Sequence, residues 1–262
     1  VVLAGDGRYL LLAFASLRHV GVFDLRTAEI VHFVDTGSED FLVAGGKTRF
    51  VVYDRASRKL RRANLATGEI DKEAVLAQRF GKLDALGLGF ESEGPVYFLG
   101  ELTDVERGCN LKKLDLETLT PVELTTSDKY WGGPNFNDLS VSADGRRVGW
   151  GQPHDRFQIF EIEGNEAKLL RFYTSMPGSV VINRAGDGFF SGPEKRLIPD
   201  VMLVTGKGRG LVSGEALEGS YWYTASFRPA GAGPTGLPIQ FFAGGETTPV
   251  AQVSIPGFGP SD

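Results

Sequence analysis

The sequence predicts an all-β fold built from repeated four-stranded units, and two recurring segments support this prediction. The first segment has two short β-type runs around a glycine-containing turn, as in LAGDGRYLLL, VAGGKTRFVV, FESEGPVYFL, VSADGRRVGW and NRAGDGFFSG. Such turns between alternating apolar and polar residues favour a hairpin, because they need a positive φ that glycine adopts freely. The second segment joins two longer β-rich runs through a short turn, as in VGVFDLRTAEIVHFV and FQIFEIEGNEAKLLRF.

The spacing of the second segment predicts the number of repeats. Equivalent positions are 40, 51, 46, 42 and 39 residues apart, at Asp24, Asn64, Asp115, Glu161, Leu203 and Phe242. Repeats of this length are typical of one four-stranded blade of a β-propeller. We therefore expect a single six-bladed β-propeller over residues 1–255 and a Gly- and Pro-rich tail at 256–262. Seven blades remain the alternative, because the sixth repeat shows only one obvious strand, in GSYWYTASF.

Two details of this fold stay open at the level of sequence. Residues 71–80 form either one or two helical turns or an outer strand with its exit loop. The ring closes either through a late strand from PVAQVSI that joins the first blade, or through residues 1–5 completing the last blade.

Composition restricts the classes of partner. The chain has 262 residues, 42% hydrophobic and 23% charged, which is ordinary for a protein with a packed core. Its net charge of −5 argues against binding to nucleic acid, which needs a concentrated basic face. No run of apolar residues approaches the length of a membrane helix. The single cysteine, Cys109, excludes an internal disulfide and a multi-cysteine metal site. Because Val1 and Val2 begin inside a strand pattern, we expect a domain covalently linked to neighbours in a longer, bacterial chain of undetermined compartment.

Short motifs carry a family resemblance. The segments FDLRT (23–27) and NLATGE (64–69) are similar to a strand–turn–strand signature, and SADGR (142–146) is similar to a turn signature. On these motifs the chain resembles the WD-repeat, YVTN and quinoprotein-like superfamily of β-propellers. It lacks the Gly-His and Trp-Asp pairs of classical WD repeats, so their internal hydrogen-bond tetrad is expected to be absent. The resemblance implies a fold and assigns no function.

The predicted loop lengths differ between the two rims of the propeller. With strands named a to d from the centre outwards, the a–b and c–d turns lie on one rim and are short. The b–c and d–a connections lie on the other rim and are longer, at 15–19, 101–110, 127–138, 151–156, 192–200 and 228–238. Since scaffolds usually carry function on loops, we expect the loop-rich rim to be the working face. Charges of both signs are mixed on these loops, which favours a protein surface or a neutral ligand.

The segment YWGGPNFND (130–138) is the strongest candidate for a binding site. Two aromatic residues, a Gly-Gly-Pro break and polar side chains on a d–a loop suit a partner anchor, since Tyr and Trp are enriched in such anchors. The predicted partner-binding residues are Tyr130, Trp131, Asn135, Phe136, His154 and Arg156. The alternative is that Trp131 and Phe136 pack between blades. His19 and His32 lie in or beside strands and are expected to be structural.

The predicted function is a non-catalytic scaffold or recognition module that binds a protein or peptide on its loop-rich face. No catalytic residue, metal or cofactor is assigned. The alternative is a propeller enzyme, such as a quinoprotein-like oxidoreductase or a calcium-dependent lactonase-like hydrolase. By resemblance to such hydrolases, Asn135, Asn137 and Asp138 would be metal ligands. Calcium needs 6–8 oxygen ligands, which would have to converge from several blades. A purely structural spacer is the third hypothesis.

Overall fold

The structure, a computed structural model, describes residues 1–80, 83–100, 111–125, 138–151, 156–174, 180–182, 184, 186, 188–191, 194–197, 201–205, 212–215, 221–225, 237–243 and 251–255. Side chains are described as far as Tyr173, apart from Arg79, Asp138 and Arg156, and then at Val181, Ile182, Arg184 and Gly186. Within these ranges the strands form six antiparallel four-stranded sheets, each made of four consecutive strands.

The first three blades occupy the N-terminal half of the chain. Blade 1 contains β1 (Val2–Ala4), β2 (Tyr9–Phe14), β3 (His19–Asp24) and β4 (Glu29–Asp35). Blade 2 contains β5 (Phe41–Gly45), β6 (Arg49–Asp54), β7 (Lys59–Asn64) and β8 (Ile70–Val75). Blade 3 contains β9 (Leu83–Gly87), β10 (Val96–Gly100), β11 (Leu111–Asp115) and β12 (Thr120–Val122). Two 3₁₀ turns, η1 (Ala15–Leu17) and η2 (Gln78–Phe80), lie in the connections.

The last three blades repeat the same order. Blade 4 contains β13 (Asp138–Val141), β14 (Arg147–Gly151), β15 (Arg156–Glu163) and β16 (Glu166–Thr174). Blade 5 contains β17 (Val180–Ile182), β18 (Gly188–Ser191), β19 (Glu194–Leu197) and β20 (Val201–Thr205). Blade 6 contains β21 (Val212–Glu215), β22 (Tyr221–Ala225), β23 (Leu237–Ala243) and β24 (Ala251–Ile255).

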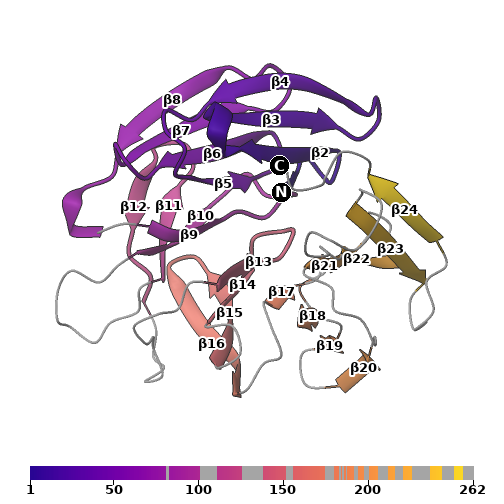
Figure 1. Cartoon of the computed structure of the whole chain (residues 1–262). Coiled ribbons are helices and arrows are strands. Elements are labelled where there is room, and N and C mark those ends of the chain that lie inside the picture. The colour runs from indigo at the N-terminus through magenta and orange to yellow at the C-terminus, as the bar shows by residue number, and fades with distance from the viewer. Residues whose placement is uncertain are drawn as a thin grey trace.

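The six sheets follow one another around a common centre, with the first strand of each blade innermost and the fourth outermost (Figure 1). The first strands of successive blades lie side by side from β1 to β17. This arrangement is a β-propeller of six four-stranded blades, as the sequence predicts. Both predicted modes of ring closure are wrong, because β24 pairs with β23 inside blade 6 and β1 pairs with β2 inside blade 1.

The core consists of apolar layers between neighbouring blades. Side chains alternate between the two faces of a strand, so each blade offers one apolar face to the blade before it and another to the blade after it. Blades 1 and 2 meet through a layer that includes Leu11, Val22 and Phe50. In the layer between blades 3 and 4, the buried rings of Trp150 and Phe160, both from blade 4, stack with their centroids 4.1 Å apart. A lone blade would leave both faces in water, which is why the repeats must stack.

Three details of the predicted strand assignment are resolved. Leu203 lies in β20, a fourth strand, so its predicted equivalence to Asp24 in a third strand is wrong. The third strand of blade 5 is β19, inside the segment 192–200 that was predicted to be a loop. Its charged sequence, EKRL, has the composition of a loop but forms a strand that pairs with β18 on one side and β20 on the other. In blade 6, β21 pairs with β22 and supplies the first hairpin that the sequence did not show.

Segment 71–80 follows the strand alternative, because it contains most of β8 and then η2. None of the helical turns in the described ranges is long and apolar enough to cross a membrane.

Candidate functional site

The predicted partner-binding residues remain untested by the structure. Tyr130, Trp131, Asn135, Phe136 and His154 lie outside the described residues. Arg156 begins β15, but its side chain is outside the described part. Asp138 begins β13 in the same way, and Asn137 precedes the described range. Among the described residues, no group of three or more His, Cys, Asp or Glu side chains could hold a metal ion.

The rim that carries the a–b and c–d turns is occupied by hydrogen bonds between blades. In each, a side chain of one blade donates to a main-chain carbonyl in a turn of the next blade. The pairs and their distances are His32 to Ala66 (2.6 Å), Arg62 to Leu116 (2.9 Å), Tyr97 to Gly145 (2.8 Å), Lys113 to Gly164 (2.5 Å) and Arg147 to Gly186 (2.5 Å). These hydrogen bonds fix the turns against the neighbouring blade, which is consistent with a structural role for this rim.

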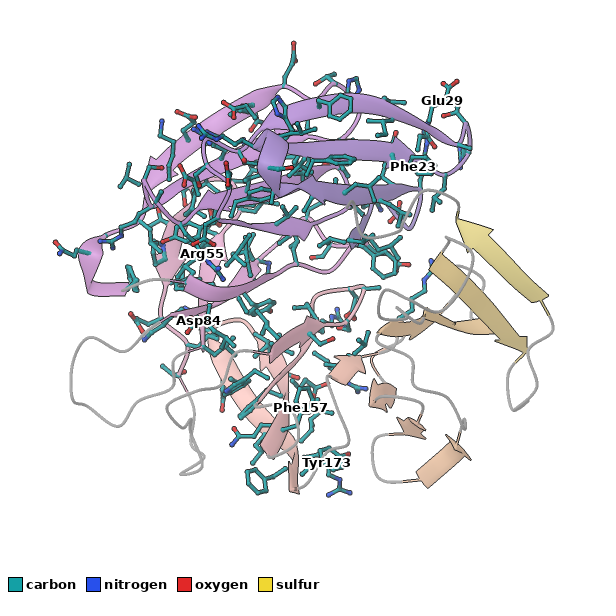
Figure 2. The ribbon with its side chains drawn as sticks, viewed as in Figure 1. Phe23, Glu29, Arg55, Asp84, Phe157 and Tyr173 are labelled. Atoms are coloured by element: carbon teal, nitrogen blue, oxygen red, sulfur yellow. The ribbon has the colours of Figure 1, made fainter. Side chains whose placement is uncertain are left out.

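On the opposite, loop-rich rim, Arg55 joins blade 2 to blade 3. Its Nε donates to the carbonyl of Leu83 (3.0 Å) and its Nη2 to the carbonyl of Asp84 (3.0 Å). Its Nη1 forms an ion pair with Asp40 Oδ1 at 2.8 Å. Figure 2 shows Arg55 and Asp84 close together at this junction. One guanidinium thus holds a b–c turn, a d–a loop and the innermost strand of blade 3.

Asp54 fixes the neighbouring loop and is only 4% exposed. Its carboxylate accepts hydrogen bonds from Ser38 Oγ (2.6 Å), Ser57 Oγ (2.5 Å) and the main-chain N–H of Ala56 (2.9 Å). Burial acts to raise the pKa of Asp54, but these donors outweigh burial and hold the pKa below its ordinary value. The group is ionised and fully engaged at neutral pH, so it has no proton to give as a general acid.

Blade 1 carries an exposed apolar cluster on the same rim, formed by Phe14, Leu17, His19 and Phe33 and called here the blade 1 patch. Phe33 is 58% exposed and Leu17 is 63% exposed. The ring of Phe33 lies 6.0 Å from that of Phe14, and the His19 ring meets Phe33 edge-on at 6.2 Å. Aromatic residues this exposed are typical of interaction surfaces, since their burial against a partner releases water from apolar area.

Local structure holds the blade 1 patch in place. Phe33 pairs with Gly21 across β3 and β4. A Cβ atom on Gly21 would lie 2.8 Å from the Phe14 ring, so the absence of a side chain at Gly21 makes room for that ring. The Nδ1 atom of His19 lies 2.5 Å from the carbonyl of Leu17 and donates to it, which fixes the imidazole beside the η1 turn. The rings are therefore presented by strands and a hydrogen-bonded turn.

A polar border adjoins the blade 1 patch. Arg18 Nη2 lies 3.8 Å from Glu39 Oε1, and both side chains are more than half exposed. An ion pair this exposed contributes little to stability, so both charged groups lie at the surface beside the patch. The border contains both signs of charge, in agreement with the mixed charges expected on these loops.

The blade 1 patch is not apparent from the sequence. His19 is predicted to be structural, whereas its ring lies at the edge of an exposed aromatic cluster. The signal was the run IVHFV inside β4, where large apolar residues follow one another instead of alternating with polar ones. His32 is structural as predicted, because its Nε2 is bound to the carbonyl of Ala66 in the next blade.

Comparison with known proteins gives relatives in structure only. No protein-family model and no curated protein matches the sequence. The β-propeller domain of Cps50 (Swd1) from Myceliophteria thermophila is similar over 96% of this chain and 83% of its own, with a TM-score of 0.64 and 10% identity. U3-55K is similar over 85% of this chain and 71% of its own, with a TM-score of 0.60 and 11% identity. The likeness establishes the fold.

Both of these relatives are WD40 β-propeller domains, so the predicted resemblance to propellers of the WD-repeat type is confirmed for the fold. At 10–11% identity it extends to the arrangement of blades and to nothing finer.

Proposed function

We propose that this propeller is a non-catalytic recognition module that binds a protein or peptide on its loop-rich rim. The observation that supports the proposal is the blade 1 patch, where two phenyl rings, a leucine and an imidazole form an exposed surface with a charged border. An apolar centre surrounded by polar groups is the usual composition of a protein-binding surface. Strand pairing and the η1 turn preorganise the patch, which lowers the entropy lost on binding.

A calcium-dependent hydrolase is the second candidate, and the described part of the rim gives it less support. Asp40 is paired with Arg55, Glu39 with Arg18, and Asp54 is saturated by serine hydroxyls and N–H groups. A calcium site needs several carboxylate or amide oxygens that converge on one point. Asn135, Asn137 and Asp138 are the residues expected to supply these oxygens, and their substitution tests this candidate.

Selection of peptides from a random library tests the proposal. Peptides would be selected on the wild-type chain and their affinities measured for Leu17→Asp and for the control Leu25→Asp. Leu25 is 42% exposed in the c–d turn of the same blade, on the opposite rim. We expect Leu17→Asp to weaken binding by about tenfold or more, because a bound peptide would have to cover and desolvate a carboxylate where the wild type has an apolar side chain. Leu25→Asp should bind as the wild type does. Equal affinities for all three chains would contradict the proposal.

Calcium titration with thermal unfolding and a chelator control separates the second candidate. A calcium-dependent stabilisation of about 2–4 kcal/mol at saturating metal would favour the hydrolase, because a ligand that binds only the folded state stabilises it. Asn135→Ala, Asn137→Ala and Asp138→Ala would then be expected to abolish the shift.

A further inference from the structure

The outermost strand of blade 1 has an open edge. β4 pairs with β3 on one side and with no strand that the structure describes on the other. Natural proteins usually protect such edges with charged residues or proline inside the strand. Among outer strands with described side chains, β8 contains Asp71, Lys72 and Glu73, β12 contains Pro121, and β16 contains Lys168 and Arg171. The interior of β4 is IVHFV, with neither an acidic or permanently charged residue nor a proline.

Apolar side chains accompany this edge. Ile30, Val31 and Phe33 of β4 are 36%, 38% and 58% exposed. His32 is the one titratable residue in the strand interior, and it is turned towards the carbonyl of Ala66 in blade 2. A strand that joined β4 would therefore gain apolar contacts along its middle.

The backbone of Phe33 faces the open edge. In an antiparallel pair, hydrogen-bonded and non-hydrogen-bonded positions alternate along the strand. The N–H of Thr36 donates to the carbonyl of Arg18 (2.9 Å), and the register continues unbroken to the pair of Phe33 with Gly21. Phe33 is three residues from Thr36, so it occupies a non-hydrogen-bonded position with respect to β3. Its N–H and C=O consequently point outwards, where an added strand could bind them.

Charge decides which strand fits. Glu29 and Asp35 lie at the two ends of β4, both exposed, and neither forms an ion pair with a described residue. Figure 2 shows Glu29 at the turn that joins β3 to β4. Antiparallel pairing of two copies centred on His32 would place Glu29 opposite Asp35, so like charges would meet at both ends. A strand with basic ends would meet opposite charges instead.

We propose that β4 is a strand-addition site for an extended peptide with apolar residues in its middle and Lys or Arg at both ends. Addition to a sheet edge uses main-chain hydrogen bonds for affinity and alternate side chains for specificity. The inference rests on the proposed function, since Phe33 belongs to both surfaces, and adds the partner's conformation and charge.

Two synthetic peptides of seven residues, the length of β4, provide the probes. One has the sequence Lys-Val-Thr-Val-Thr-Val-Lys and the other replaces both lysines with glutamate, with all termini blocked. We expect the basic peptide to bind at least about tenfold more tightly at low salt, because both of its ends meet a carboxylate. Glu29→Lys should weaken the basic peptide by about three- to tenfold and improve the acidic one. Equal affinities of the two peptides for the wild type would overturn the inference.

A matched pair of substitutions tests the backbone contact. Phe33→Ala and Phe33→Pro both remove the ring, but only Phe33→Pro removes the outward N–H, which β3 does not use. We expect Phe33→Pro to bind the basic peptide about tenfold less tightly than Phe33→Ala does. Hydrogen exchange of the Phe33 amide in the wild type gives an independent readout, and saturating peptide should slow it. An unchanged exchange rate would overturn strand addition, even if Phe33→Pro fails to fold.

The outcomes also distinguish this inference from the proposed function. If library peptides depend on Leu17 but no peptide protects the Phe33 amide, the blade 1 patch remains the binding site and strand addition is wrong. If the basic peptide protects Phe33 while binding is insensitive to Leu17→Asp, strand addition holds and the rim patch is not the site.

Discussion

Arg62 and Lys113 occupy equivalent positions in successive blades, and each donates to a main-chain carbonyl in the c–d turn of the next blade. Arg62 lies two residues before Asn64 and reaches Leu116 at 2.9 Å; Lys113 lies two residues before Asp115 and reaches Gly164 at 2.5 Å. The repeat therefore places a basic side chain where a neighbouring turn has a free carbonyl. Such bonds fix one blade against the next at the turns of the rim, whereas the apolar layers join the blades between their strands.

Replacing Arg62 should loosen the junction of blades 2 and 3. The Arg62 side chain is 8% exposed and also pairs with Asp71 (2.7 Å) and Glu117 (2.9 Å). We expect Arg62→Met to lower the free energy of unfolding by about 2 kcal/mol, because two carboxylates lose their more buried basic partner and a turn carbonyl loses its donor. Urea unfolding measures the change.

Arg49→Met is the control for Arg62→Met. Arg49 contacts the same two carboxylates but is 28% exposed, and solvent compensates for the loss. We expect a change below about 1 kcal/mol. Equal effects of the two substitutions would show that burial of Arg62 does not matter.

The phenol of Tyr97 should make a measurable contribution to the junction of blades 3 and 4. Its hydroxyl donates to the carbonyl of Gly145 (2.8 Å) in a buried position, and burial raises the pKa of Tyr97. Tyr97→Phe keeps the ring and should cost about 1–2 kcal/mol, because the carbonyl loses its donor. Tyr9→Phe is the control, since the half-buried Tyr9 contributes its ring to a cation–π contact with Arg8. A Tyr97→Phe chain as stable as the Tyr9→Phe chain would refute the prediction.

Acid should destabilise the fold below about pH 4.5. Hydrogen bonds lower the pKa of Asp54 despite its burial, and those from Arg61 and Lys59 lower the pKa of Glu73, from usual values of 3.8 and 4.5. A carboxyl whose pKa is lower in the folded state stabilises the fold above its unfolded pKa. This stability is lost as the pH falls through the folded pKa.

Asp54→Asn tests the assignment to Asp54. We expect it to cost about 2 kcal/mol at pH 7, because charge-assisted hydrogen bonds become neutral. The cost should be clearly smaller at pH 3, because this pH lies below the usual pKa of the carboxyl in the unfolded chain, so part of the stabilisation by Asp54 is already lost. Chemical unfolding at the two pH values measures the difference. A cost that does not change with pH would exclude Asp54 as a source of the acid sensitivity.

The blade repeat was predictable because turn chemistry and the two-residue alternation of strands are local properties. Glycine and the flanking apolar residues predict the hairpins around GDG and ADG, and both hairpins form. Blade 5 was misassigned, because EKRL has the composition of a loop and becomes a strand through pairing on both sides. The blade 1 patch was missed because exposure is not visible in a sequence, where Phe33 looks like any core phenylalanine.

The sequence by itself determined the all-β class, the repeat of about one blade and the tight turns, since these follow from neighbours along the chain. Only the tertiary structure decided which strands close the ring, which carbonyls receive Arg62 and Lys113, and which aromatic rings remain in water. Gly89 illustrates the difference: a Cβ atom there would lie 2.4 Å from the carbonyl oxygen of Ala143, in the next blade. Residues so far apart in the chain meet only through the stacking of blades, so no local pattern records the contact.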